Sequence, residues 1–148
     1  MSRSLGLDIG DRRIGVAISD AEGILASPNT IITYNDDKEA IDSIIEITKK
    51  QEIGQIVVGL PRALDGSLGV QAEKVQAFVQ KLSQVTGVPI EFRDERMTTL
   101  LARRLMRDAS EKKSIKRKTL DDAAAAAVIL QAYLDEKRVP AEDQGLSD

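Results

Sequence analysis

The sequence contains neither cysteine nor histidine in its 148 residues. Without cysteine, disulfides and thiolate metal sites are excluded, and a reducing compartment is permitted. Without histidine, histidine-based catalytic triads and histidine-ligated zinc are excluded as well. Any metal ion bound by this chain must therefore be held by oxygen ligands, which suits hard cations such as Mg²⁺ or Mn²⁺.

Long apolar runs are missing too. No segment reaches the roughly 18 uninterrupted apolar residues that a membrane-spanning helix needs. The N-terminus enters a short apolar strand directly and has no signal-peptide layout. We therefore expect a cytoplasmic protein with no membrane partner. The remaining composition, 42% hydrophobic and 30% charged, is ordinary for one compact domain of this length.

Positive charge is concentrated in one segment. The net charge is −3, but residues 96–118 carry nine Lys or Arg against only two acids, so this stretch is +7 and the rest of the chain is −10. A basic segment of this kind suits contact with nucleic-acid phosphates. A solvated helix face followed by a loop explains it equally well.

Hydrophobic periodicity predicts an α/β domain. Period-two or short β-branched runs predict five strands, at Leu5–Ile9, Ile14–Ser19, Ile24–Tyr34 (interrupted near Pro28), Ile56–Val58 and Val88–Arg93. Helical spacing predicts four helices, at Asp37–Gln51, Val70–Val85, Thr98–Ala109 and Thr119–Glu136. A strand meander followed by β-α-β units implies a mixed five-stranded sheet with helices on both faces, in three layers. We place the folded domain at residues 1–138 and expect 139–148 to be a polar, disordered tail.

Asp8 is the first candidate functional acid, because it lies inside a predicted strand, where folding does not require a carboxylate. Strand alternation places Leu5, Leu7 and Ile9 on one face, and Gly6, Asp8 and Gly10 on the other. A charge in a strand interior is costly to bury without a partner, and the small neighbours leave room for one to approach. The structural alternative is a strand-end carboxylate paired with an arginine.

Two further acidic positions attract attention. Glu95 follows the predicted strand that ends at Arg93, and ligands gather at the carboxyl ends of parallel strands. A salt bridge at the rim of the fold is the alternative. Asp121 and Asp122 begin the last predicted helix, where acids also suit the helix dipole. Asp122, however, shares a stripe with Ala126, Ile129 and Tyr133, which should face the sheet.

Spacing alone does not show that these acids meet. If they do, three clustered carboxylates repel one another unless cations neutralise them. Two Mg²⁺ or Mn²⁺ ions roughly 4 Å apart could then bind a phosphate, activate water and stabilise the leaving oxygen.

Four segments resemble the motifs of the YqgF/RuvX family, whose members are described as pre-16S rRNA nucleases and Holliday junction resolvase-like proteins. The segments cover nearly the whole chain, from about residue 4 to 135, and stand in the family's order: Leu7–Gly10 continuing to Arg13–Ala17, Ile56–Pro61 followed by Asp65–Ser67, Asp94–Thr99, and Lys118–Ala124 running on to Ile129–Gln131. Four motifs in order are far more specific than any one alone.

The resemblance implies a ribonuclease H-like fold and a metal-dependent nuclease. Its catalytic and metal-binding acids carry over to Asp8, Glu95 and Asp122, with Asp8 bridging two cations and each of the others completing one coordination sphere. Alignment through Ile129–Gln131 selects Asp122 over Asp121, where the family tends to have an apolar residue. This departure leaves open whether Asp121 is an additional ligand.

The implied partner is nucleic acid, either structured RNA such as pre-16S rRNA or junction DNA. Candidates for phosphate contacts are Arg13, Arg96, Lys116 and Lys118, which would make binding fall steeply with salt. With two Tyr, two Phe and no Trp, a large base-stacking platform is disfavoured, so recognition by backbone and shape is expected. We expect a monomer or a weak homodimer.

Two other classes of function remain open. A phosphotransfer ATPase of the actin and sugar-kinase type also has Asp-x-Gly after its first strand, as Asp8-Ile9-Gly10 does here. Such enzymes normally need two domains, and the chain has no Gly-Lys-Ser/Thr phosphate loop. A non-catalytic RNA-binding assembly factor that kept the fold is the second. Within the nuclease class, cleavage of pre-16S rRNA is preferred to cleavage of DNA junctions on the resemblance alone.

Overall fold

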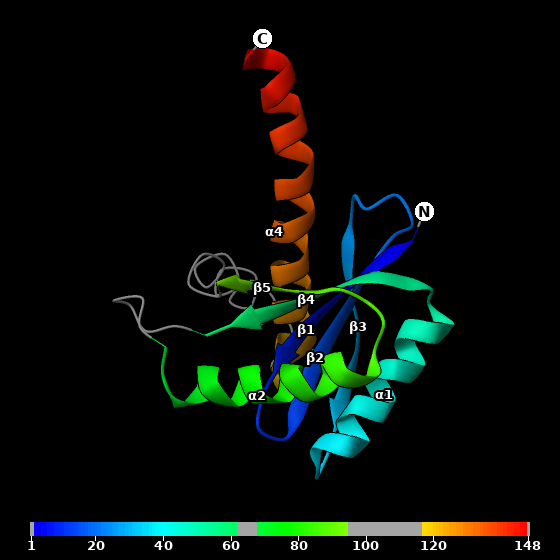
Figure 1. Ribbon diagram of the computed structural model, residues 1–148, viewed down its shortest axis with the longest axis vertical. Coiled ribbons are helices and arrows are strands. Elements are labelled where there is room, and N and C mark those ends of the chain that lie inside the picture. Colours follow the sequence, from blue (N-terminus) through cyan, green and yellow to red (C-terminus); the bar gives the residue numbers. More distant parts are fainter. Residues whose placement is uncertain (1, 62–67, 95–116, 148) are drawn as a thin grey trace.

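The computed structural model describes the backbone of residues 2–61, 68–94 and 117–147, and the side chains of residues 2–61, 68–94 and 122–137 (Figure 1). The predicted helix Thr98–Ala109 and most of the basic segment lie outside the described residues.

Five strands form one mixed sheet in the order β3-β2-β1-β4-β5. Their bounds are β1 (Arg3–Ile9), β2 (Arg13–Ser19), β3 (Ala26–Thr33), β4 (Ile53–Leu60) and β5 (Ile90–Asp94). β1 pairs antiparallel with β2, and β2 with β3, whereas β1 and β4, and β4 and β5, pair in parallel. The predicted meander and the mixed sheet are both confirmed.

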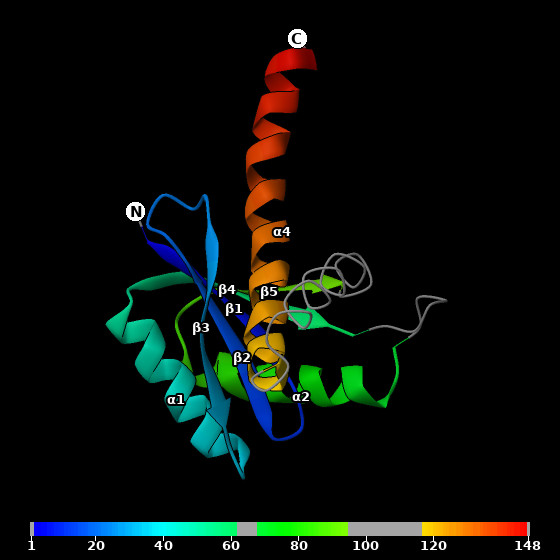
Figure 2. The same ribbon diagram turned by 180° about the vertical axis from the view of Figure 1, so that it is seen from behind.

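Helices cover both faces of the sheet. α1 (Asp37–Lys50) and α2 (Val70–Val85) lie on one face, and α4 (Arg117–Ser147) crosses the other (Figures 1 and 2). α1 begins where the Asp36 side chain accepts a hydrogen bond of 2.8 Å from the backbone N–H of Glu39. The predicted three-layer arrangement is confirmed.

The predicted interruption near Pro28 is a β-bulge in β3. Ala17 pairs with Pro28 and Val16 pairs with Thr30, so Asn29 is the additional residue. Proline has no backbone N–H to donate, and it is tolerated here because β3 is an edge strand.

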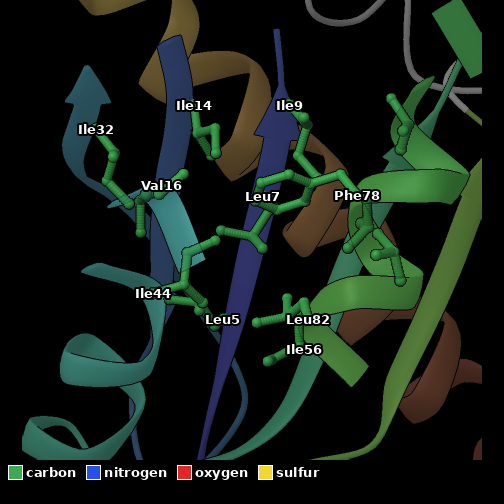
Figure 3. Close-up of a cluster of buried hydrophobic side chains, with 14 of the residues drawn as sticks. Leu5, Leu7, Ile9, Ile14, Val16, Ile32, Ile44, Ile56, Phe78 and Leu82 are labelled. Atoms are coloured by element: carbon green, nitrogen blue, oxygen red, sulfur yellow. The ribbon is translucent and has the colours of Figure 1, made fainter. Parts of the chain in front are cut away.

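Alternation along β1 divides its side chains between two cores. Leu5, Leu7 and Ile9 belong to the larger core beneath α1 and α2, where Ile44 and Phe78 pack against the sheet (Figure 3). The smaller core, beneath α4, consists of Ala17, Val57, Ala126, Ile129, Leu130, Tyr133 and Leu134. The predicted sheet-facing stripe of α4 is therefore buried as expected.

α4 is longer than the periodicity predicts. It continues through Ser147, and its C-terminal part extends beyond the sheet (Figure 1). The backbone of residues 139–147 is thus helical where composition predicts a disordered tail, and the domain boundary at residue 138 stays a prediction. In the described parts of the chain, no helix is long and apolar enough to cross a membrane.

Candidate active site

Asp8 lies near the C-terminal end of β1, on the face that α4 covers. Its neighbours Leu7 and Ile9 point into the opposite core, and Asp8 itself is half-buried. Across the antiparallel pair, Asp8 stands directly opposite Gly15 of β2. Side chains at such opposed positions share one face of the sheet, so whatever lies over Gly15 also lies beside Asp8.

Asp122 lies over Gly15. An ideal Cβ at residue 15 would overlap the carbonyl oxygen of Asp122, so the helix rests directly on the strand. Gly6 makes a similar contact one turn further along α4, where a Cβ would fall 2.8 Å from Leu130 Cβ and 2.9 Å from the carbonyl oxygen of Ala126. Glycines on this face thus bring the N-terminal part of α4 down onto the sheet, and Asp122 to the position beside Asp8.

The Asp122 carboxylate is incompletely compensated. Its Oδ2 atom is buried and has no hydrogen-bond partner among the described side chains. Arg13 Nε approaches Oδ2 to 3.3 Å, which meets the distance for an ion pair but not the geometry of a hydrogen bond. Burying carboxylate oxygen without full hydrogen bonding is unfavourable, and a cation relieves it. The donor chemistry at this point therefore fits a hard divalent cation.

The third predicted acid, Glu95, lies outside the described residues. β5, which ends at the preceding residue Asp94, runs parallel to β4 and β1, so the C-terminal ends of these three strands share one edge of the sheet. Pairing of Leu60 with Asp94 places the end of β5 level with the end of β4. Within the described residues, no group of three acids is assembled that could hold a metal ion. Convergence of Glu95 on Asp8 stays a prediction.

The tight β1–β2 turn fixes the backbone that carries Arg13. Gly10 N–H donates to the carbonyl oxygen of Arg13 at 2.9 Å, and the Tyr34 hydroxyl donates to the carbonyl oxygen of Gly10 at 2.5 Å. Burial, followed by the nearby Asp37 and Asp11 carboxylates, raises the pKa of Tyr34. Tyr34 therefore remains a protonated donor at neutral pH, which keeps this turn in place.

Arg93 links β5 to α4, and sequence reasoning did not identify it. Its guanidinium lies 5.0 Å from the centre of the Tyr133 ring. Arg93 also forms ion pairs with Glu91 at 2.8 Å and with Glu136 at 3.0 Å. Burial and the Glu91 charge raise the pKa of Tyr133. No local sequence pattern reveals this network, because Arg93 and its partners on α4 are about 40 residues apart. The one sequence feature that could have drawn attention to Arg93 is its position next to the Asp94-Glu95 motif.

The other predicted site residues are placed only in part. Arg13 contacts Asp122. Arg96 and Lys116 lie outside the described residues, and Lys118 and Asp121 are placed in the first turns of α4 by their backbone alone. Their predicted contacts with phosphate or metal therefore stay predictions.

Comparison with known proteins identifies close relatives. Residues 2–136 match the RuvX family, described as "Holliday junction resolvase". A protein of Caldanaerobacter subterraneus subsp. tengcongensis is 45% identical over 136 residues, covering 92% of this chain and 98% of the relative. A Dehalococcoides mccartyi protein is 48% identical over 132 residues, covering 89% and 97%. Both relatives bear the name "Putative pre-16S rRNA nuclease".

Solved structures share the fold at low sequence identity. Thermus thermophilus RuvC in complex with a Holliday junction substrate superposes with a TM-score of 0.63 at 13% identity, over 93% of this chain and 96% of RuvC. The fowlpox virus resolvase in complex with junction DNA gives 0.55 at 14% identity, over 90% and 97%. The predicted ribonuclease H-like fold is confirmed.

Proposed function

Because this chain belongs to the RuvX family, we propose that it is a metal-dependent nuclease that processes the 5′ end of pre-16S rRNA during ribosome biogenesis. The single observation that carries the proposal is the buried Asp122 Oδ2, which has no hydrogen-bond partner among the described residues and belongs to a residue whose backbone rests on Gly15, the strand partner of Asp8. Such an oxygen beside a second carboxylate provides ligands for Mg²⁺ or Mn²⁺. The names of the relatives support precursor rRNA as the substrate.

In this proposal Asp8, Glu95 and Asp122 hold the cations. β5 ends at Asp94, on the sheet edge shared with the end of β1, and Glu95 is the next residue of the sequence, which supports its assignment as the third ligand. Two divalent cations, when bound, would supply Lewis acidity for the attack of water on phosphorus and for the departure of the leaving oxygen. The protein supplies a rigid seat for the acids, since glycines bring α4 and β1 into direct contact.

Cationic side chains bind the substrate backbone in this account. Arg13 lies at the site, and the basic segment that includes Arg96, Lys116 and Lys118 leads into α4. Each phosphate neutralised by such a residue makes binding more sensitive to salt. A nuclease that processes pre-16S rRNA would act in the bacterial cytoplasm, which is the localisation we propose.

Junction DNA is the second candidate substrate. The family description and the two resolvases of similar fold favour it. Symmetric cleavage of a four-way junction would need a two-fold dimer presenting two sites, whereas processing of one RNA end needs only a monomer. The actin-like ATPase alternative is disfavoured, because the family match covers residues 2–136 and the relatives are named nucleases.

The test compares cleavage of a pre-16S rRNA 5′-end fragment with cleavage of a four-way DNA junction. Wild type is assayed with Mg²⁺, with Mn²⁺ and with EDTA, next to Asp8→Asn and to a control, Asp42→Asn, whose carboxylate is exposed on α1. We expect RNA cleavage that requires metal, is lost in Asp8→Asn and is kept in Asp42→Asn. Preferential cleavage of the four-way junction would make junction DNA, and not pre-16S rRNA, the preferred substrate. Metal-independent binding without any cleavage would instead favour a non-catalytic assembly factor.

A further inference from the structure

We propose that Arg13 is a resident counter-cation for Asp122, which a divalent cation displaces and which then becomes available to a phosphate of the substrate. The inference rests on the proposed function, because it assumes that Asp122 is a metal ligand. It goes beyond that function by coupling metal loading to nucleic-acid binding through one side chain.

The ion pair is placed where exchange can occur. Arg13 Nε lies 3.3 Å from the same Asp122 oxygen, Oδ2, that lacks a hydrogen-bond partner among the described side chains. Among the described side chains, Arg13 is therefore the cation that balances this oxygen. A divalent cation bound to Oδ2 would face the positive guanidinium at close range, and like charges this near repel each other strongly. Arg13 must then withdraw or lose most of its interaction with Asp122.

The side chain of Arg13 can move while its backbone stays fixed. The Arg13 carbonyl oxygen accepts the hydrogen bond from Gly10, and Arg13 pairs with Thr33 in the sheet. Its side chain is 34% exposed, so withdrawal from Asp122 leads towards solvent rather than into a packed core. A guanidinium offers five N–H donors in a planar fork that suits phosphate oxygens. After its side chain leaves Asp122, Arg13 would stay close to the acids because its backbone is fixed, and its guanidinium could contact a phosphate bound there.

Two opposite effects of one substitution follow. Without Arg13, a divalent cation no longer competes with an ion pair for Asp122, so Arg13→Ala should bind metal more tightly. The same variant lacks a phosphate contact and should bind nucleic acid more weakly. A purely structural arginine would weaken both, and an arginine that touches only phosphate would leave metal affinity in the absence of nucleic acid unchanged.

The test measures Mn²⁺ binding without nucleic acid, by electron paramagnetic resonance of free Mn²⁺, on wild type, Arg13→Ala and Arg12→Ala. Arg12→Ala is the matched control, because it removes the same charge from the neighbouring, exposed position. We expect the dissociation constant for Mn²⁺ to fall about two- to fivefold in Arg13→Ala, the range for a partly exposed ion pair, and by less than about 1.5-fold in Arg12→Ala. Arg13→Gln, which keeps a long polar side chain, should behave like Arg13→Ala and replaces it if Arg13→Ala unfolds.

A second measurement follows RNA binding with Mg²⁺ in the Asp8→Asn background, where cleavage is blocked. Adding Arg13→Ala should weaken binding and lower the slope of log affinity against log salt by about one. Equal Mn²⁺ affinity in Arg13→Ala, Arg13→Gln and Arg12→Ala overturns the inference. If Arg13→Ala binds Mn²⁺ more tightly than wild type but wild type cleaves neither RNA nor DNA, the nuclease proposal is contradicted. The displacement of Arg13 from Asp122 by metal is then still supported. If wild type does not bind Mn²⁺, both the nuclease proposal and the inference about Arg13 are contradicted.

Discussion

Gly15 of β2 and Asp122 of α4 are in direct contact, although 107 positions separate them in the chain, and no side chain would fit on residue 15. Because Asp8 is the strand partner of Gly15, this contact determines where the carboxylate of α4 lies relative to that of β1. In the site that we propose, the absence of a Cβ at residue 15 therefore serves the placement of the acids as well as the packing of α4 on the sheet.

Substitution of Gly15 by alanine tests this contact. The added Cβ must push α4 away from β2, and overpacking of this kind typically lowers the free energy of unfolding by about 1–3 kcal/mol. We expect urea denaturation to show such a loss, together with weaker Mn²⁺ binding. Gly87→Ala is the control, because no described atom beyond the two neighbouring residues lies within 4 Å of a Cβ at that position. Equal stability of the two variants would show that α4 does not rest on Gly15.

Substitution of single acids distinguishes the metal ligands from adjacent acids that do not bind metal. Asp8→Asn and Asp122→Asn each retain shape but lose a charge that a divalent cation needs, so we expect cleavage to fall by at least about 100-fold. Asp121→Asn should have a much smaller effect, because Asp122 lies over Gly15. Rates of RNA cleavage at saturating Mg²⁺ measure all three. A loss in Asp121→Asn that matches the loss in Asp122→Asn would make Asp121 a ligand.

Arg93 tests how β5 is joined to α4. Arg93→Ala removes the cation over Tyr133 and the pairs with Glu91 and Glu136, and leaves little apolar contact in their place. Since Arg93 is only 22% exposed whereas Glu136 is 58% exposed, the ring contact and the stem contribute more than that ion pair. We expect thermal unfolding to report a loss of about 1–2 kcal/mol. Lys137→Ala, at a more exposed position over the same ring, should cost less than about 0.5 kcal/mol. Equal losses would contradict this account.

The two tyrosines predict an alkaline limb of stability. Burial raises the pKa of both Tyr34 and Tyr133 above the ordinary value of 10.0, so the folded chain holds these protons more tightly than the unfolded chain. Stability should be full below pH 10 and fall as pH rises through the raised pKa values. The chain has no tryptophan, so tyrosinate absorbance reports these two groups directly. Tyr34→Phe should leave one group titrating above pH 10; titration of either tyrosine below pH 10 would contradict the assigned burial.

Local patterns sufficed for the five strands and for α1 and α2, but not for the C-terminal extent of α4. Alternation in β1 correctly assigned Leu5 and Leu7 to one face and Asp8 to the other, and the break near Pro28 corresponds to the bulge at Asn29. Helical spacing predicted α2 at its observed bounds and α1 to within one residue at its C-terminal end. These features depend on interactions within a few residues, which a single sequence carries.

Long-range relationships could not be derived in the same way. The stripe of Asp122 predicted that its helix face would meet the sheet, but not that Gly15 would lie beneath it. Arg93 looked like an ordinary strand residue because its partners on α4 are about 40 positions away. The assignment of Glu95 came from the family resemblance, and its convergence with Asp8 stays a prediction.

In the nuclease that we propose, Asp8 and Asp122 bind the same divalent cations together with Glu95. Anomalous X-ray scattering from crystals grown with Mn²⁺ tests it most directly. We predict an Mn²⁺ peak within about 2.0–2.4 Å of carboxylate oxygens of both Asp8 and Asp122, with Glu95 completing the coordination shell. An Mn²⁺ peak that touches neither acid, or a Glu95 carboxylate more than about 10 Å from Asp8 in the metal-loaded protein, would contradict it.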